Sequence, residues 1–107
     1  MNFRVLYTDT AKQDLREIAI YIAELSKEKE TAKRFVNELR EKTKVLETFP
    51  ESGAVPNDRV LKTQAYRFLV HKDYVIFYHY NEQEKASYIL SVFHAKRDYV
   101  RVMKKLI

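Results

Sequence analysis

The chain has 107 residues, 46% of them hydrophobic, with one glycine, two prolines and no cysteine. This composition fits a single folded domain over residues 1–107, and it excludes disulfides and thiolate metal sites. The net charge of +5 favours acidic partners such as RNA, DNA or an acidic protein, although ordinary surface lysines explain it as well.

The N-terminal half predicts one strand followed by two helices. Asn2 to Tyr7 alternates apolar and other residues, as a strand with one buried face does. Thr10 to about Leu25 has apolar residues at steps of three and four, which predicts an amphipathic helix, and Thr10 with Gln13 fits a capping box. A short charged turn leads to a second helix that runs to about Thr48. It ends there because Pro50 disfavours helical geometry in the residue before it.

The C-terminal half predicts a loop, three strands and a short tail. Residues 50–58, PESGAVPND, are the turn-rich stretch of the chain and predict a loop. Residues 71–73 form a tight turn inside the central hairpin, and residues 99–107 form a basic tail of one or two helical turns. Three segments rich in β-branched and aromatic residues predict the strands: Val60 to Val70, Tyr74 to Tyr80 and Ala86 to Phe93.

The predicted order is β-α-α-β-β-β, which makes an α+β domain of two layers. Two helices with a short connection favour an antiparallel helical hairpin, and that hairpin covers one side of an antiparallel sheet. The other side of the sheet is then expected to be wet. Arg67 stands where a core strand would carry an apolar residue, and alternation predicts that it shares the wet face with His79, beside the segment from His94 to Tyr99.

Few familiar chemistries fit this sequence. It contains no metal-ligand spacing, no Gly-rich phosphate loop and no GxSxG serine, so we expect no metal and no cofactor. A signal peptide and a bilayer-spanning run of roughly 20 apolar residues are also missing, which predicts a cytoplasmic protein without membrane contact.

One group of side chains from three neighbouring segments of the sheet could carry chemistry: Arg67, His79, His94, Lys96, Arg97 and Tyr99. Cations can stabilise the charge of a phosphorane, and histidine or tyrosine can transfer protons, so metal-independent cleavage of RNA by its 2′-hydroxyl is possible. Each residue also has a structural interpretation, such as a solvated arginine, a histidine that satisfies a backbone carbonyl or an aromatic residue at the rim of the core. The parity of His94 with Val92 predicts that it points toward the core.

Six segments of the chain resemble the toxins of the RelE/ParE superfamily, which are the toxic halves of bacterial type II toxin–antitoxin operons. In chain order they are AKQDL from Ala11, Ile18 to Ile22, LETFPESG from Leu46, Ala65 to Arg67, Tyr74 to Tyr78 and HAKRD from His94. The resemblance covers nearly the whole chain and implies the superfamily's β-α-α-β-β-β fold. It also implies a cytoplasmic growth inhibitor that an antitoxin, often acidic, neutralises by wrapping around it.

The resemblance implies one of two activities. RelE-like members cleave mRNA in the ribosomal A site, whereas ParE-like members lack a working nuclease site and inhibit DNA gyrase. If the chain is a nuclease, the implied catalytic residues are Arg67, His94, Arg97 and Tyr99. The resemblance places Arg59 and Lys62 in a region that supplies basic residues in RelE, and with Lys96 they are the candidate nucleic-acid-binding residues. The HxxRD ending, the PxxG after the second helix and the long charged hairpin look ParE-like. We therefore expect a gyrase inhibitor that is not an enzyme, with the ribosome-dependent endoribonuclease as the alternative.

Overall fold

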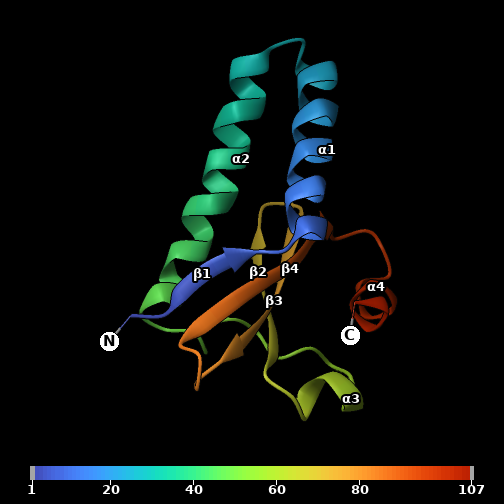
Figure 1. The fold of residues 1–107 in the computed structure, drawn as a ribbon. Helices are drawn as coiled ribbons and strands as arrows, with labels where there is room; N and C mark the ends of the chain where they lie inside the picture. The colour runs from blue at the N-terminus through green and yellow to red at the C-terminus, as the bar shows by residue number, and fades with distance from the viewer. Residues whose placement is uncertain (1, 107) are drawn as a thin grey trace.

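A helical hairpin, a four-stranded sheet and short helices make up the fold, which Figure 1 shows as a computed structural model describing residues 2–106. Its elements, in chain order, are β1 (Arg4–Tyr7), α1 (Asp9–Ser26), α2 (Lys29–Thr43), the 3₁₀ helix η1 (Lys44–Glu47), α3 (Arg59–Lys62), β2 (Tyr66–His71), β3 (Tyr74–Asn81), β4 (Ala86–His94) and α4 (Tyr99–Lys105). The two long helices stand side by side and extend beyond the end of the sheet. Within the described residues, no helix has the length and apolar character needed to cross a membrane.

The strands lie in the order β1-β4-β3-β2. β2 pairs with β3, and β3 with β4, in the antiparallel sense expected of strands joined by tight turns. β1 pairs with β4 in the parallel sense, from Arg4 opposite Ala86 to Tyr7 opposite Ile89. The α+β prediction is confirmed, but the sheet is mixed and not purely antiparallel as predicted. β1 and β4 are far apart in sequence, so no tight turn dictates their relative direction.

Thr8, and not the predicted Thr10, caps the first helix. Its hydroxyl oxygen accepts a hydrogen bond from the backbone N–H of Ala11 at 3.1 Å, and its hydroxyl donates to the carbonyl of Ile89 at 3.0 Å. The capping-box prediction at Thr10 and Gln13 is therefore wrong. Thr8 satisfies an unpaired helix N–H and also ties the start of α1 to β4, a long-range contact that local sequence spacing does not reveal.

The second helix is shorter than the sequence predicts. α2 ends at Thr43, and the chain continues to Glu47 as the tighter turn η1. Thr43 is buried, its hydroxyl donates to the carbonyl of Arg40 at 2.7 Å, and it pairs with the hydroxyl of Tyr7 at 2.8 Å. The tighter turn places Leu46 in the core, where it is fully buried.

Residues 59–65 are not part of a strand, contrary to the prediction for Val60 to Val70. Arg59–Lys62 form the short helix α3, because the carboxylate of Asp58 accepts hydrogen bonds from the backbone N–H groups of Val60 and Leu61 at 3.0 and 3.2 Å. β2 then begins only at Tyr66. The adjacent apolar residues Val60 and Leu61 thus belong to a helical turn that buries Leu61.

The core has two parts, one on each face of the sheet. The larger part lies between the sheet and the helical hairpin, and its buried residues are Ala11, Leu15, Ile18, Leu39, Leu46, Leu69, Ile76, Tyr78, Ile89 and Val92. The smaller part lies on the opposite face, where α3 and α4 cover the strands, and its buried residues are Leu61, Val75, Phe77, Phe93 and Met103. The prediction that this second face is wet is therefore wrong.

The C-terminal segment is what closes that second face. The tail forms the short helix that the sequence predicts. α4 buries Met103 completely, and Val102 and Leu106 pack against the same cluster. The Nζ of Lys104 lies 2.9 Å from a carboxylate oxygen of Asp58, so an ion pair joins α4 to the start of α3. This contact lowers the pKa of Asp58, chiefly through the hydrogen bond from Lys104.

Candidate functional site

Arg67 lies on β2, half-buried, and its side chain is directed at the loop after η1. One guanidinium nitrogen, Nη1, donates to the carbonyl oxygens of Glu51 and Gly53, each at 3.1 Å. The hydroxyl of the neighbouring Tyr78 binds the same loop, by donating to the carbonyl of Pro50 at 2.6 Å and accepting from the N–H of Gly53 at 3.0 Å. Arg67 and Tyr78 together hold this loop against the sheet.

Arg67 and His79 do not share a face of the sheet, which corrects the sequence prediction. The hairpin turn has two residues, Lys72 and Asp73, so odd-numbered residues of β2 lie opposite even-numbered residues of β3. Arg67 therefore pairs with Tyr78 on the face of the helical hairpin, and Tyr66 pairs with His79 on the opposite face.

The ring of His79 is packed among aromatic residues. It lies 4.6 Å from the ring of Tyr66, measured between centroids, and burial lowers its pKa below the ordinary value of 6.5. This position places His79 at the border of the smaller core and separates it from Arg67.

His94 and Arg97 are the two predicted catalytic residues that the structure brings together. They line a small open hollow of about 220 Å³ beside α1, together with Asp14, Glu17 and Tyr21 from that helix, and Ile18, Tyr74, Val92 and Phe93 complete its lining. His94 is the last residue of β4, half-buried and on the face of the helical hairpin, as its parity predicts.

The geometry of His94 restricts its chemistry. Its ring meets the ring of Tyr74 edge-on, with centroids 5.3 Å apart and planes at 72°. Its Nδ1 accepts a hydrogen bond from the backbone N–H of Lys96 at 3.1 Å. The neutral ring then carries its proton on Nε2, so His94 can donate a hydrogen bond into the hollow while its lone pair is already used.

Asp14 is a residue that the sequence analysis missed. β1 stops pairing with β4 at Ile89. Beyond that residue, Asp14 of α1 binds the edge of β4 that β1 leaves unpaired. Its carboxylate accepts hydrogen bonds from the hydroxyl of Ser91 at 2.6 Å and from the backbone N–H of Val92 at 2.9 Å. A signal was present, because Asp14 has helical spacing with the apolar Ala11 and Ile18 and therefore turns toward the sheet.

Tyr99 lies apart from the other predicted catalytic residues. It begins α4, and its ring is 5.9 Å from the ring of Phe68 on the face opposite the helical hairpin. Arg67 is on the hairpin face but far from His94, because Arg67 lies opposite Tyr78 whereas His94 lies opposite Tyr74. Four residues of extended strand correspond to about 13 Å along β3. The four side chains therefore do not surround one reacting group.

The predicted nucleic-acid-binding residues are also divided between two places. Arg59 and Lys62 are exposed on α3, near the start of β2, whereas Lys96 is exposed in the turn after β4. These places correspond to opposite ends of β3, because β2 starts opposite His79 and β4 ends opposite Tyr74. No single basic surface includes all three.

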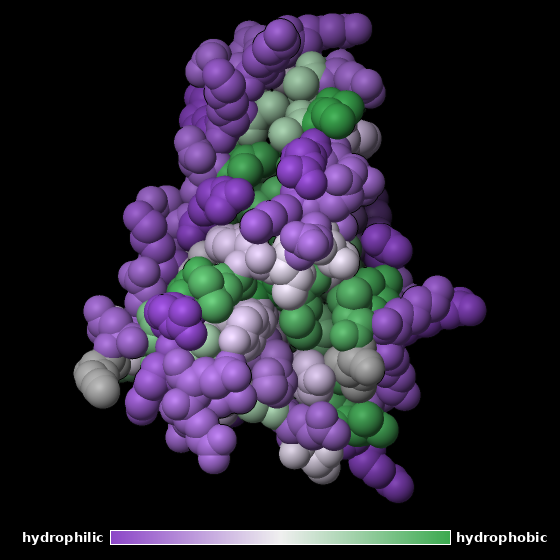
Figure 2. All heavy atoms as spheres, viewed as in Figure 1, coloured by the Kyte–Doolittle hydropathy of each residue, from purple (hydrophilic) through white to green (hydrophobic). Residues whose placement is uncertain are grey.

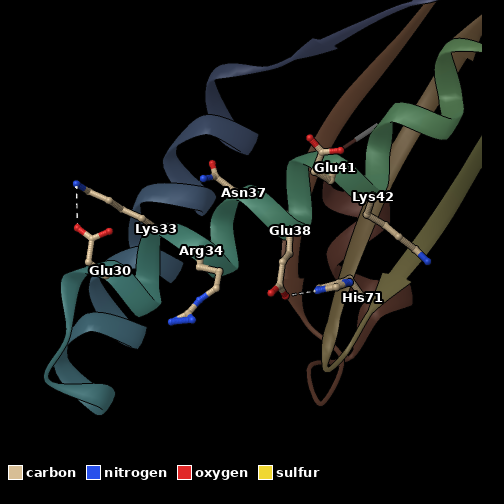
Figure 3. Close-up of a pocket in the computed structure, with 8 residues that line it drawn as sticks. All are labelled: Glu30, Lys33, Arg34, Asn37, Glu38, Glu41, Lys42 and His71. Carbon is tan, nitrogen blue, oxygen red and sulfur yellow. Dashed lines mark hydrogen bonds and ion pairs between the residues drawn. The ribbon is translucent and has the colours of Figure 1, made fainter.

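A broad hollow of about 850 Å³ runs along α2 toward the end of β2 (Figure 3). Its charges are mixed, and its lining residues are Glu30, Lys33, Arg34, Asn37, Glu38, Glu41, Lys42 and His71. Within residues 2–106, no group of three or more His, Cys, Asp or Glu side chains is arranged to hold a metal ion, in this hollow or elsewhere.

Glu38 is the centre of that hollow's contacts, and Figure 3 shows it directed at His71. One carboxylate oxygen lies 3.0 Å from Nε2 of His71 and 3.2 Å from Nζ of Lys72, and the ring of Phe35 lies beside both partners. The hydrogen bond from His71, and then that from Lys72, lowers the pKa of Glu38. This cluster fastens the β2–β3 turn to α2, so its role is structural.

Comparison with known proteins adds a family and a set of similar folds. Residues 5–99 match the model of the family described as ParE toxin of type II toxin–antitoxin system, parDE. No curated protein sequence matches the chain.

Among solved structures, the chromosomal ParDE toxin–antitoxin system from P. aeruginosa is similar, with a TM-score of 0.72, 21% identity, and coverage of 88% of this chain and 97% of that one. The toxin–antitoxin complex RelBE2 from Mycobacterium tuberculosis has a TM-score of 0.66 and 20% identity, with coverage of 90% of this chain and 95% of that one. The isolated E. coli RelE toxin has a TM-score of 0.55 and 14% identity, with coverage of 98% of this chain and 99% of that one. At these identities the likeness establishes the fold, which ParE-like and RelE-like proteins share.

Proposed function

The chain belongs to the ParE toxin family of type II toxin–antitoxin systems, and from that membership we propose that it inhibits bacterial growth until a cognate antitoxin binds it. We propose DNA gyrase as its target, in the bacterial cytoplasm, and inhibition by binding without a catalytic step. The net charge of +5 suits an antitoxin with an acidic segment.

The separation of the four candidate catalytic residues supports binding over catalysis. General acid–base cleavage of RNA needs the base, the acid and the charge-stabilising cation within hydrogen-bond reach of one phosphate. Here Tyr99 packs on Phe68, on the face opposite Arg67 and His94. Nη1 of Arg67 is occupied by two backbone carbonyls, and the Nδ1 lone pair of His94 by a backbone N–H. This dispersal is the observation that carries the proposal.

The direct test combines purified protein with purified DNA gyrase. We expect supercoiling to be inhibited, or gyrase-cleaved DNA to accumulate, in proportion to the amount of toxin added. Purified antitoxin should reverse the effect. Gyrase whose supercoiling and cleavage are unchanged by an excess of folded toxin would contradict the proposed target.

The second candidate function is ribosome-dependent cleavage of mRNA. The hollow that unites His94 and Arg97 with the hydroxyls of Tyr21 and Tyr74 favours it, because these groups could donate hydrogen bonds to a phosphate. Programmed ribosomes incubated with the toxin test this candidate by primer extension. Cuts in the A-site codon that disappear in the His94→Ala variant would favour the nuclease, whereas uncut mRNA would favour gyrase.

A further inference from the structure

The positive charge of the chain is concentrated near its C-terminal end. Residues 95–105 contain five of the 20 basic residues and one of the 15 acidic residues, so they carry four of the five net positive charges. Their basic residues are Lys96, Arg97, Arg101, Lys104 and Lys105. Figure 2 shows hydrophilic side chains that project into solvent on the side of the molecule where α4 lies in Figure 1. The net charge therefore belongs mainly to one surface.

Three of these cations line a hollow of about 680 Å³ between the start of α1, the strand β4 and α4. We call it the α4 hollow. The cations are Arg97, Arg101 and Lys105, and Asp14 and Asp98 also line it. Arg101 and Lys105 are four residues apart, which corresponds to about 6 Å along the helix axis. They therefore lie on the same face of α4, and both are exposed.

The two carboxylates of the α4 hollow are bound by the protein itself. Asp14 accepts hydrogen bonds from a hydroxyl and a backbone N–H of β4. Asp98 caps α4 by accepting a hydrogen bond from the backbone N–H of Arg101 at 3.3 Å. Among residues 2–106, neither carboxylate forms an ion pair with Arg97, Arg101 or Lys105. The three like charges repel one another, and a bound polyanion would relieve that repulsion.

α4 holds its cations on a fixed support. Met103 is fully buried beneath the helix, and Lys104 is paired with Asp58 at 2.9 Å. Arg101 and Lys105 each lie two residues from Met103, which is about 200° around the helix, so they are directed away from the core. An anion that binds there orders two side chains and no backbone, which keeps the entropic cost of binding low.

The lining of the α4 hollow indicates recognition by charge and not by stacking. None of the described residues that line it is aromatic, and Tyr99 at the start of α4 packs against Phe68 instead. Proteins that hold single-stranded nucleic acid stack its bases on aromatic side chains. Double-stranded DNA keeps its bases stacked on one another and carries one phosphate charge per about 1.7 Å of its axis. It is the polyanion that matches fixed cations without a stacking surface.

We propose that the α4 hollow binds the phosphate backbone of double-stranded DNA through Arg97, Arg101 and Lys105, and that this DNA is the segment held by gyrase. Each cation pairs with a phosphate, so the contact is independent of base sequence. The assignment to the DNA on gyrase rests on the proposed function. The preference for a duplex phosphate backbone rests only on the charges and the lining of the α4 hollow.

The probe is a fluorescein-labelled DNA duplex of about 20 base pairs, and fluorescence anisotropy measures its binding to the full chain at about 50 to 200 mM salt. The test variant is Arg101→Gln with Lys105→Gln. Arg97 stays unchanged because it also lines the small hollow beside α1. The matched control is Lys12→Gln with Arg16→Gln, which removes one lysine and one arginine at the same spacing from exposed positions of α1. Circular dichroism melting checks that both variants remain folded.

Three phosphate contacts predict that the logarithm of the binding constant falls with the logarithm of salt concentration with a slope of about −2.7. Loss of two contacts should reduce that slope to about −0.9. We expect the test variant to bind the duplex about tenfold more weakly than the parent chain, because each lost exposed charge pair contributes severalfold. The control should bind within about twofold of the parent chain, because only distant charge is lost.

Equal weakening of the two variants, or no binding of the duplex by the parent chain at the lowest salt concentration, would overturn the proposal. Three competitor probes test the identity of the polyanion: a uridine homopolymer, an RNA duplex of the same sequence and a polyglutamate peptide. Tighter binding of any of them than of the DNA duplex, with dependence on Arg101 and Lys105, would overturn the assignment to DNA.

Inhibition of gyrase is measured separately with the same proteins. A test variant that loses DNA binding but inhibits supercoiling as strongly as the parent chain would remove the DNA contact from gyrase inhibition and leave the proposed function intact. A parent chain that binds the duplex through Arg101 and Lys105 but leaves gyrase unchanged would contradict the proposed target, while the DNA-binding surface would stand.

Discussion

The hydroxyl of Tyr78 occupies the space that a side chain at Gly53 would need. A Cβ atom on Gly53 would lie 2.6 Å from that oxygen and 2.8 Å from the carbonyl oxygen of Phe68. Both distances are too short for unbonded atoms, and Gly53 has no positive φ. The only glycine of the chain is therefore required for close approach of the loop to the sheet, where its N–H donates to Tyr78 at 3.0 Å.

Replacing Gly53 with alanine should destabilise the protein by about 2 kcal/mol, because the added methyl group must displace Tyr78 or the backbone of β2. Urea denaturation gives the free energy of unfolding. The exposed neighbour Ser52 provides the control, since Ser52→Ala removes no contact of this kind and should change stability by less than about 0.5 kcal/mol. Similar values for the two variants would show that the loop moves away at little cost.

Tyr78 should also make stability fall at alkaline pH. Burial raises its pKa from 10.0 to about 12. Between these values the unfolded chain has lost the phenolic proton and the folded chain keeps it, so stability is fully present below pH 10 and is lost as pH rises toward 12. A shift of this size corresponds to a loss of about 3 kcal/mol once both states are deprotonated, and about half of that loss is expected by pH 11. Denaturation from pH 8 to pH 11 tests it, and Tyr78→Phe should flatten the profile while lowering stability at neutral pH, because Pro50 and Gly53 lose their partner.

Local patterns in the sequence were enough for most of the fold. The apolar stripe predicted α1, and the aromatic and β-branched runs predicted β3 and β4. The basic tail forms a helix, as predicted. The errors lie where a distant contact or a side-chain cap decides. Asp58 turns the apolar start of the predicted second strand into α3, and Thr8 caps α1 because it also reaches Ile89.

The candidate site was less predictable than the fold. The sequence analysis singled out Arg67 because a core strand would carry an apolar residue there. Its guanidinium contacts the carbonyls of Glu51 and Gly53. The alternation of residues in a strand does not predict this contact with a distant loop. Its supposed face-sharing with His79 depended on the length of the turn. One residue more or less in that turn reverses which residues of β2 and β3 share a face, so an argument from parity alone could not settle it.

Thr8→Val should cost about 1 to 2 kcal/mol of stability, as loss of a helix cap does. It removes the acceptor for the N–H of Ala11 and the donor to the carbonyls of Ile89 and Leu90. Thr10→Val is the matched control, since Thr10 is exposed and the cap of α1 is the side chain of Thr8. Thermal or urea denaturation of the two variants decides between the caps. A larger loss at Thr10 would restore the capping box that the sequence suggested.

His79 should make stability fall on mild acidification. Its pKa is lowered from 6.5 by burial, so the unfolded chain takes up a proton at a higher pH than the folded chain does. The contribution is present above pH 6.5 and is lost as pH falls through the folded-state value. Proton NMR of the ring gives that value directly, and His79→Phe should weaken the dependence of unfolding on pH between 7 and 5. A ring midpoint at or above 6.5 would contradict the burial argument.

Arg67→Ala should lower stability by about 1 kcal/mol, the usual net worth of a hydrogen-bonded contact, because the carbonyls of Glu51 and Gly53 lose their donor. If Arg67 only holds this loop, toxicity should change no more than in Tyr78→Phe, which loosens the same loop without removing a charge. Growth arrest at equal amounts of folded protein is the measurement, with stability measured alongside. Loss of toxicity in Arg67→Ala but not in an equally destabilised Tyr78→Phe would mean that the guanidinium contacts the target or the RNA itself. Retained toxicity in both would leave Arg67 as a structural residue and weaken the nuclease alternative.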